Sequence, residues 1–241
     1  MVNNCIEYIE ILHYDCVDST NKVAFEYQDN KHLLTILSDT QTNGRGRMGR
    51  DFYSYNGGLY MSVILEPRKI QIPFHICTPT AALAVLDTLE MYGVCNCELK
   101  WVNDILLDGR KICGILTECR TENNEIERIV VGIGINISES DIEFPEDIKQ
   151  KAGTVNINDN RKNIACSITK QLGNYLSLDV HEIVSEYEKR LNSIGKIITV
   201  TDYADNYKRI TGKVIGITDD CFLKIELSDK TTKIISSGEI I

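Results

Sequence analysis

The spacing of apolar residues changes near Gly195, and this change constrains the fold more than any other feature of the chain. Up to that point strand-like runs alternate with helical stretches, whereas the remainder follows a β pattern. Turn residues at Asp219-Asp220 and Ser228-Asp229 help to separate the later runs, which span Ile197–Val200, Thr211–Ile217, Phe222–Glu226 and Thr232–Ile235. We therefore predict two domains, residues 1–193 and residues 194–241, of which the second is a small β-barrel.

The larger domain combines strands and helices. The sequence predicts helices over residues 18–28, 78–92, 162–177 and 179–192, and strands over residues 6–12, 33–38, 58–65, 97–107, 111–119 and 128–137. Asp108-Gly109 lies between two of the strand-like runs and is a strong signal for a tight hairpin turn. Because hairpins join antiparallel strands, we expect an α+β domain, with a mixed sheet and helices packed on it, rather than a doubly wound parallel sheet.

The net charge of −9 argues against general affinity for nucleic acid or for an anionic membrane surface. The chain has no apolar run long enough to span a membrane, and its N-terminus lacks the basic and apolar regions of a signal peptide. We therefore expect a cytoplasmic protein. The nine cysteines include no Cys-x-x-Cys pair, so we expect free thiols rather than a zinc site.

Residues 44–50 read Gly-Arg-Gly-Arg-Met-Gly-Arg, which suits an anion. Glycine lets the backbone approach a ligand closely, and arginine offers a permanent planar charge to phosphate and carboxylate oxygens. The segment formally matches the dinucleotide fingerprint G-x-G-x-x-G, but that fingerprint requires a helix immediately afterwards, and residues 51–58 have no helical period. The Walker A pattern fails too, because no Gly-Lys-Ser/Thr follows. An anion-binding loop and a solvated basic loop both remain open.

Two further clusters lie within strand-like runs. Lys100-Trp101-Val102-Asn103-Asp104 comes near the end of one run, where strand alternation makes Lys100 and Trp101 face different environments. Taken alone, this cluster is equally consistent with a surface lysine followed by a turn. Gly132 and Gly134 interrupt a β-branched run. Such glycines mark close approach by a ligand or another chain segment, or a β-bulge.

The combination of motifs is more specific than any one of them. In chain order they are Asp18-Ser19-Thr20-Asn21, Gln41 with the glycine–arginine segment, Lys100-Trp101-Val102-Asn103-Asp104, Lys111-Ile-Cys-Gly-Ile-Leu-Thr-Glu118 and Gly-Ile-Gly-Ile-Asn136. This series closely resembles the biotin–protein ligases, over about residues 10–140. The resemblance implies a catalytic fold like that of class II aminoacyl-tRNA synthetases, followed by a Src-homology-3-like barrel.

The resemblance also implies a two-step reaction. The carboxylate of biotin attacks the α-phosphorus of ATP, which gives biotinyl-5′-adenylate and pyrophosphate. A lysine of a biotin carboxyl carrier protein domain then attacks this mixed anhydride and releases AMP. Both steps bring anions together and develop charge on phosphate or carbonyl oxygens, so arginines, a lysine and backbone N–H groups suit them.

Site residues follow from the same resemblance. Those implied for biotin are Ser19, Thr20, Asn21, Gln41, Arg45, Gly46, Arg47, Lys100, Gly114 and Ile115. Those implied for ATP are Arg45, Arg47, Phe52, Asn103 and Asn136, with Asn136 on the adenine. Arg47 and Lys100 are the expected catalytic residues, Arg47 near the phosphate and Lys100 bridging the biotin carboxylate and the α-phosphate. Mg²⁺ is expected on the ATP phosphates, with Asp104 as a candidate for positioning it.

The chain departs from the family pattern at two positions. Val102 stands where the family commonly has proline, and we expect only a local backbone difference there. Phe52 stands nearest to a position that is often tryptophan, and phenylalanine can still stack on adenine with less area. Neither change removes a charged participant.

Alternatives of other kinds stay open. A lipoate–protein ligase or octanoyl transferase has the same fold, although the transferase needs a nucleophilic cysteine. A non-catalytic biotin sensor would keep the pocket without the chemistry. The first motif begins by residue 18, which leaves no room for the winged helix-turn-helix of many bacterial relatives, so we expect no DNA binding. A homodimer is a further family expectation.

Overall fold

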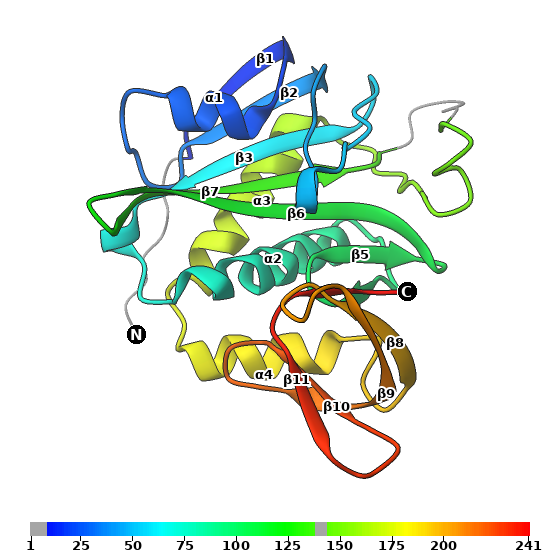
Figure 1. Cartoon of the computed structure of the whole chain (residues 1–241). Coiled ribbons are helices and arrows are strands. Elements are labelled where there is room, and N and C mark those ends of the chain that lie inside the picture. The colour runs from blue at the N-terminus through cyan, green and yellow to red at the C-terminus, as the bar shows by residue number, and fades with distance from the viewer. Residues whose placement is uncertain (1–8, 138–143) are drawn as a thin grey trace.

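The computed structural model describes residues 9–137 and 144–241. Its larger part is built on a seven-stranded sheet with the strand order β1-β2-β3-β7-β6-β5-β4 (Figure 1). The strands are β1 (Ile11–Val17), β2 (Thr35–Gln41), β3 (Leu59–Leu65), β4 (Glu98–Lys100), β5 (Asp104–Leu107), β6 (Arg110–Glu122) and β7 (Glu125–Ile135). β1 and β2 run parallel, and all the other neighbours run antiparallel. The predicted mixed sheet is confirmed.

Helices cover both faces of this sheet. They are α1 (Thr20–Glu26), α2 (Cys77–Met91), α3 (Arg161–Tyr175) and α4 (Val180–Arg190), with short 3₁₀ turns at Arg47–Gly49, Pro67–Lys69 and Phe74–Ile76. α2 is buried along most of its length, and α3 and α4 pack against it. α1 lies on the opposite face, where it forms a small second core with β2, β3 and β7 (Figure 1).

Strand alternation decides which residues meet which helix. On β7, Val131 and Ile133 point into the large core with α2, whereas Val130 joins the small core under α1. Successive side chains in a strand point to opposite faces, so Gly132 and Gly134 lie on the same face as α1. This face carries the candidate site.

Local signals account for the hairpin between β5 and β6. Asp108 and Gly109 have φ angles of 51° and 73°, and Leu107 pairs with Arg110 across the turn. Two consecutive positive φ angles define the two-residue hairpin turn that favours Asp-Gly. The predicted tight turn is therefore confirmed.

Two strand predictions need correction. The first strand is β1 at Ile11–Val17 rather than at residues 6–12, of which residues 6–8 lie outside the described part of the chain. The single strand predicted over residues 97–107 is two strands, because residues 101–103 form a turn between β4 and β5. Asn103 stabilises this turn by donating its side-chain N–H to the carbonyl of Ile115, 3.0 Å away.

The C-terminal part is a five-stranded antiparallel sheet with the order β11-β10-β9-β8-β12. Its strands are β8 (Ile197–Asp202), β9 (Lys208–Ile217), β10 (Leu223–Glu226), β11 (Thr232–Ile235) and β12 (Gly238–Ile240). Among the described residues no pairing joins β11 to β12, so the sheet is open where a closed barrel was expected. β12 was not predicted, since it has only three residues. No helix within the described ranges is long and apolar enough to cross a membrane.

Candidate functional site

A cleft opens on the α1 face of the large sheet, and its free space of about 460 Å³ includes the open solvent at its mouth. Its lining comes from the start of α1, the end of β2, the glycine–arginine segment, the turn after β4, and β6 and β7. The lining residues are Ser19, Thr20, Asn21, Gln41, Arg45, Gly46, Arg47, Phe52, Asn103, Lys111, Gly114, Ile115, Leu116, Gly132, Ile133 and Gly134. Of the residues predicted from the sequence, Lys100, Asp104 and Asn136 are absent from this lining.

One wall of the cleft is a polar network at the N-terminus of α1. The backbone N–H and the hydroxyl of Thr20 both donate to Gln41 Oε1, at 2.8 and 3.1 Å. Gln41 Nε2 in turn donates to Ser54 Oγ at 2.9 Å. The Gln41 amide is therefore held from both ends.

A buried serine extends this wall toward β6. Ser62 Oγ lies 2.7 Å from Thr20 Oγ1 and 2.6 Å from Asn21 Oδ1, and Asn21 Nδ2 donates to Glu118 Oε2 at 2.6 Å. Ser62 is fully buried, and Thr20 and Asn21 are 4% and 6% exposed. Buried polar groups that are paired in this way hold one geometry, which pre-organises the wall for a polar ligand.

Glycines form the floor of the cleft. Gly114 and Gly134 are cross-strand partners on β6 and β7, and the ring of Phe52 lies directly on them. A Cβ atom at Gly134 would come within 2.5 Å of the Phe52 ring, and one at Gly132 within 2.3 Å of Asn21 Oδ1. The interrupting glycines therefore mark close approach by other chain segments, one of the alternatives drawn from the sequence.

The glycine–arginine segment folds back on itself without forming a longer helix. Phe52 N donates to Gly44 O at 2.8 Å, and Gly46 N donates to Arg50 O at 2.7 Å, with the Arg47–Gly49 turn at the tip. A Cβ at Gly44 would lie only 2.5 Å from Phe52 O, so this position requires glycine. The structure agrees with the exclusion of a Rossmann turn, because no α-helix follows the segment.

Arg47 points toward the turn after β4. Its Nη1 donates to Asn103 Oδ1 at 2.9 Å, and its guanidinium carbon lies 6.0 Å from the centre of the Tyr203 ring. Burial lowers the pKa of Arg47, which nevertheless keeps its charge at any physiological pH. A partly desolvated cation next to a cleft attracts an anion more strongly than one in water does.

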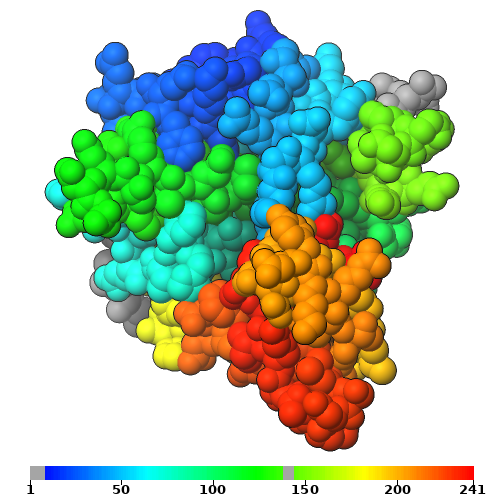
Figure 2. Space-filling model, in the orientation of Figure 1, coloured from blue at the N-terminus to red at the C-terminus, as the bar shows by residue number. Residues whose placement is uncertain are grey.

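The last arginine of the segment binds the C-terminal sheet instead. Arg50 donates to both carboxylate oxygens of Glu239 at 2.8 and 2.9 Å and to the Tyr203 hydroxyl at 3.0 Å. Figure 2 shows the light-blue segment around residue 50 meeting the orange part of the C-terminal sheet. This contact joins regions far apart in the chain, and the local sequence pattern carries no signal of it.

Lys111, rather than Lys100, lies in the cleft. Lys111 Nζ is 2.7 Å from Asp104 Oδ1 and 5.9 Å from the centre of the Phe52 ring, and it lies close to Gly114. Lys100 ends β4 and does not line the cleft. Each lysine belongs to one of the quoted motifs. Lys100 pairs with Asp104, and Asp104 pairs with Gly114, so Lys100 lies on the same face of the sheet as the cleft, but only Lys111 is among the lining residues.

Asn136 lies just beyond β7 and is 6% exposed. Its Nδ2 donates to the carbonyls of Lys111 and Gly153 at 3.3 and 2.9 Å, whereas its Oδ1 is buried without a hydrogen-bond partner among the described residues. An unpaired buried acceptor is costly, and a ligand that donates a hydrogen bond to it would offset that cost.

No group of three or more His, Cys, Asp or Glu side chains in the described part of the chain could hold a metal ion. Asp104 is ion-paired with Lys111. The residues present therefore match no closed protein-only metal site.

Comparison with known families decides the assignment. A model described as the Biotin/lipoate A/B protein ligase family matches residues 14–136, and one described as the Biotin protein ligase C terminal domain matches residues 193–241. The chain belongs to the biotin–protein ligase family. Members of this family are ligase enzymes, and the predicted family resemblance is confirmed.

Individual relatives agree with this family. The bifunctional ligase/repressor BirA of Bacillus subtilis is 30% identical over 94% of this chain and 72% of its own length. The biotin–[acetyl-CoA-carboxylase] ligase of Paracoccus denitrificans is 32% identical over 50% of this chain and 52% of its own. The biotin protein ligase from Aquifex aeolicus, solved in complex with biotin and ATP, superposes with a TM-score of 0.82 at 27% identity, covering 97% of this chain and 98% of that one.

Proposed function

We propose that this protein uses ATP to activate biotin as biotinyl-5′-adenylate and transfers the biotin to a lysine of a biotin carrier domain. One observation carries the proposal: a single cleft joins a buried polar wall, a glycine floor and the cations Arg45, Arg47 and Lys111. The Aquifex relative, solved with biotin and ATP, supports the choice of both ligands.

The polar wall is the part suited to biotin. The ureido ring of biotin has both N–H donors and a carbonyl acceptor, and it would lose affinity in a pocket that left them unpaired. Ser19, Thr20, Asn21 and Gln41 bring hydroxyl and amide groups to this wall. Because glycine has no side chain, the Phe52 ring and the Asn21 amide can lie directly on the sheet, and they bring an aromatic face and a polar group to the floor of the cleft.

The cations suit the activation step. Two anions, the biotin carboxylate and the α-phosphate, must approach within bonding distance, and a cation between them lowers their repulsion. We assign this bridging role, expected of Lys100 from the sequence, to Lys111, because Lys111 lines the cleft. Arg45 and Arg47 on the glycine–arginine segment would cover the phosphate.

The far end of the cleft suits the nucleotide. Phe52 offers an aromatic face and Asn103 lies beside Arg47, both in the cleft lining. Asn136 lies outside this lining, and its unpaired buried Oδ1 would accept a hydrogen bond from the adenine amino group. Mg²⁺ carried on ATP needs only one or two protein carboxylates, because phosphates and water fill its other positions. Asp104 meets that requirement, and the ion would neutralise phosphate charge.

The test is a reconstitution with purified protein. We expect pyrophosphate release only when ATP and biotin are both present, and a mass increase at one lysine when a biotin carrier domain is added. Parallel reactions with lipoate and octanoate test the alternative ligases of the same fold. Pyrophosphate release with lipoate but not with biotin would refute the proposal, and biotin binding without any pyrophosphate would favour a sensor.

A cysteine-dependent octanoyl transferase has less support. Cys113 follows Lys111 closely in β6, and it is fully buried. Burial raises the pKa of its thiol well above the ordinary value, which disfavours the nucleophilic thiolate. The dithiolane ring of lipoate also has no N–H or carbonyl group that could form hydrogen bonds with the polar wall.

The wider setting rests on the same proposal. The acceptor would be the carrier domain of a biotin-dependent carboxylase, in the cytoplasm. The net charge of −9 supports the prediction that the chain does not bind DNA, which a gel-shift assay checks. Light scattering would decide whether the protein forms the expected homodimer.

A further inference from the structure

Arg128 is a buried cation outside the cleft. It lies on β7, is 2% exposed, and its Nη1 lies 2.9, 3.2 and 2.6 Å from the carbonyl oxygens of Ala24, Phe25 and Tyr27. These carbonyls belong to the C-terminal end of α1 and the residue after it. The side chain thus binds the end of the helix that is remote from the cleft.

α1 depends on such an external contact. The helix has seven residues, and helices of this length are unstable alone. Its last carbonyls have no partners within the helix and carry the negative end of the helix dipole. No basic residue occurs in its own last turn. Arg128 supplies the missing positive charge and hydrogen bonds from the sheet below.

β7 holds α1 at both ends. At the N-terminal end, Gly132 leaves room for Asn21, since a Cβ there would come within 2.3 Å of Asn21 Oδ1. Arg128 stands four residues earlier on the same face, roughly 13 Å away at the rise of a strand. Asn21 and Tyr27 are roughly 9 Å apart at the rise of a helix. The two contacts therefore bracket the helix along its axis.

We propose that Arg128 is a positioning residue for biotin: by fixing the end of α1, it sets where Ser19, Thr20 and Asn21 stand in the cleft. This inference rests on the function proposed above. Arg120, the cross-strand partner of Arg128, donates to Phe25 O at 3.0 Å but is exposed and already paired with Glu127. It supplements the contact and cannot replace it.

The positioning role of Arg128 concerns biotin and not ATP. The α1 residues belong to the biotin end of the cleft, whereas the groups proposed for ATP come from other elements. A shift of α1 should therefore weaken biotin binding and leave ATP binding unchanged. A purely structural role would lower the fraction of folded enzyme and so reduce kcat without changing either KM.

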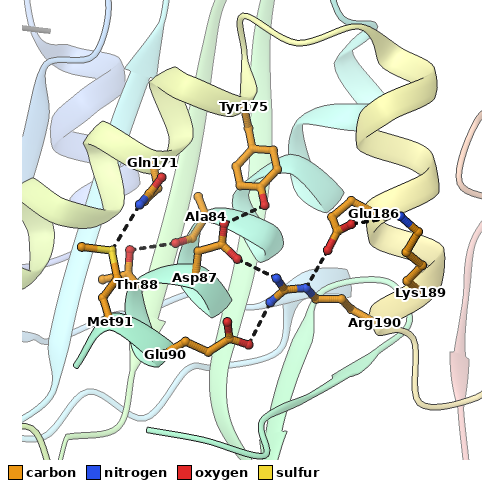
Figure 3. A network of polar contacts seen from close by, with 10 residues as sticks. All are labelled: Ala84, Asp87, Thr88, Glu90, Met91, Gln171, Tyr175, Glu186, Lys189 and Arg190. Carbon is orange, nitrogen blue, oxygen red and sulfur yellow. Dashed lines mark hydrogen bonds and ion pairs between the residues drawn. The ribbon is translucent and has the colours of Figure 1, made fainter. Parts of the chain in front are cut away.

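The experiment compares two arginine-to-lysine variants. Arg128→Lys keeps the charge and loses the planar fork, and we expect the KM and the calorimetric Kd for biotin to rise about tenfold, with kcat and the KM for ATP within about twofold of the wild type. The matched control is Arg190→Lys. Arg190 joins α4 to α2 through its ion pairs with Asp87 and Glu90 (Figure 3), and its hydrogen bonds and ion pairs within the described part of the chain include none to α1. It should lose stability and keep the wild-type KM for biotin.

The possible outcomes distinguish failure of the role proposed for Arg128 from failure of the proposed ligase function. An unchanged biotin KM in Arg128→Lys, or equal rises in both KM values, overturns the inference while the wild-type enzyme remains active. Absence of biotin-dependent pyrophosphate release in the wild type refutes the proposed function instead. If Arg128→Lys cannot be obtained folded, Arg128→Gln, which can still donate one N–H to the carbonyls, is measured under the same criteria.

Discussion

Individual residues in the cleft affect their neighbours in two ways: glycines leave space for a neighbouring side chain, and charged side chains pair with one another. Gly114 and Gly134 leave a shelf for the Phe52 ring, and that ring in turn lies beside the ammonium group of Lys111. The Lys111 charge is balanced by Asp104, 2.7 Å away. A bound carboxylate or phosphate can share this cation, because the Lys111 side chain remains 37% exposed.

Substitution of the two lysines tests which of them activates biotin. We expect Lys111→Ala to reduce biotin-dependent pyrophosphate release by about 100-fold or more, because one preorganised cation at the reacting oxygens is removed. Lys100→Ala should stay within about threefold of the wild type. Both variants should retain measurable biotin binding by calorimetry. The opposite pattern would restore the role to Lys100, as the sequence first indicated.

The two lysines also show how far sequence reasoning reaches. The family resemblance assigns Ser19, Thr20, Asn21, Gln41, Arg45 and Arg47 to the binding of one ligand. The structure brings all six residues into one cleft. Lys100 and Lys111 both lie on the cleft face, so which of them lines the cleft depends on the irregular register between β5 and β6 and on where each strand ends. Neither is fixed by local spacing. Gly132 and Gly134 matter because they lack a side chain, and the same property distinguishes them within a β-branched run of the sequence.

At the scale of elements, local periodicity of the sequence predicts most helices and strands. It does not predict how these elements pack against one another. α2 and the Asp-Gly hairpin were predictable because one has a long apolar pattern and the other a specific turn chemistry. Apolar packing joins α2, α3 and α4 in the main core, and polar contacts between residues far apart in the chain add to it (Figure 3). Arg190 binds Asp87 at 2.9 Å, Glu90 at 3.0 Å and Glu186 at 3.1 Å, and Tyr175 donates to Asp87 at 2.7 Å.

Removal of Arg190 should loosen this helical layer. We expect Arg190→Met to lower the free energy of unfolding by about 1–2 kcal/mol, between the limits for exposed and buried ion pairs, since the Arg190 side chain is 24% exposed. Urea titration followed by circular dichroism measures the change. Lys189→Met is the matched control, because Lys189 is 67% exposed and contacts only Glu186 in this network. Equal losses in the two variants would show that the network adds nothing.

At the scale of the whole molecule, the C-terminal sheet is attached to parts of the chain that make the cleft. Trp101 lies in the same turn as Asn103, is 3% exposed and donates its indole N–H to Cys221 O at 2.9 Å. Arg50 binds Glu239 on β12. The motif tryptophan thus serves the contact between the two sheets, while Asn103 in the same motif lines the cleft. The C-terminal sheet is placed to set the rest position of the glycine–arginine segment.

Release of the Arg50–Glu239 contact should free that segment without unfolding the protein. Both side chains are about half exposed, 54% and 43%, so the pair adds less than about 1 kcal/mol to stability. We expect Glu239→Gln to increase the rate of trypsin cleavage at Arg45, Arg47 and Arg50 several-fold, with the midpoint of thermal unfolding nearly unchanged. Glu226→Gln is the matched control, since Glu226 lies in the same sheet and pairs with Lys230.

The pH dependence of this contact has a definite sign. The hydrogen bond from Arg50 lowers the pKa of Glu239 below its ordinary value of 4.5, so the contact is fully formed above that pH and is lost as the pH falls through the lowered pKa. The difference in cleavage rate between the wild type and Glu239→Gln should therefore be constant from pH 6 to pH 9. It should shrink with added salt, which screens exposed charges. A difference that disappeared within that pH range would mean that some group other than Glu239 holds the segment.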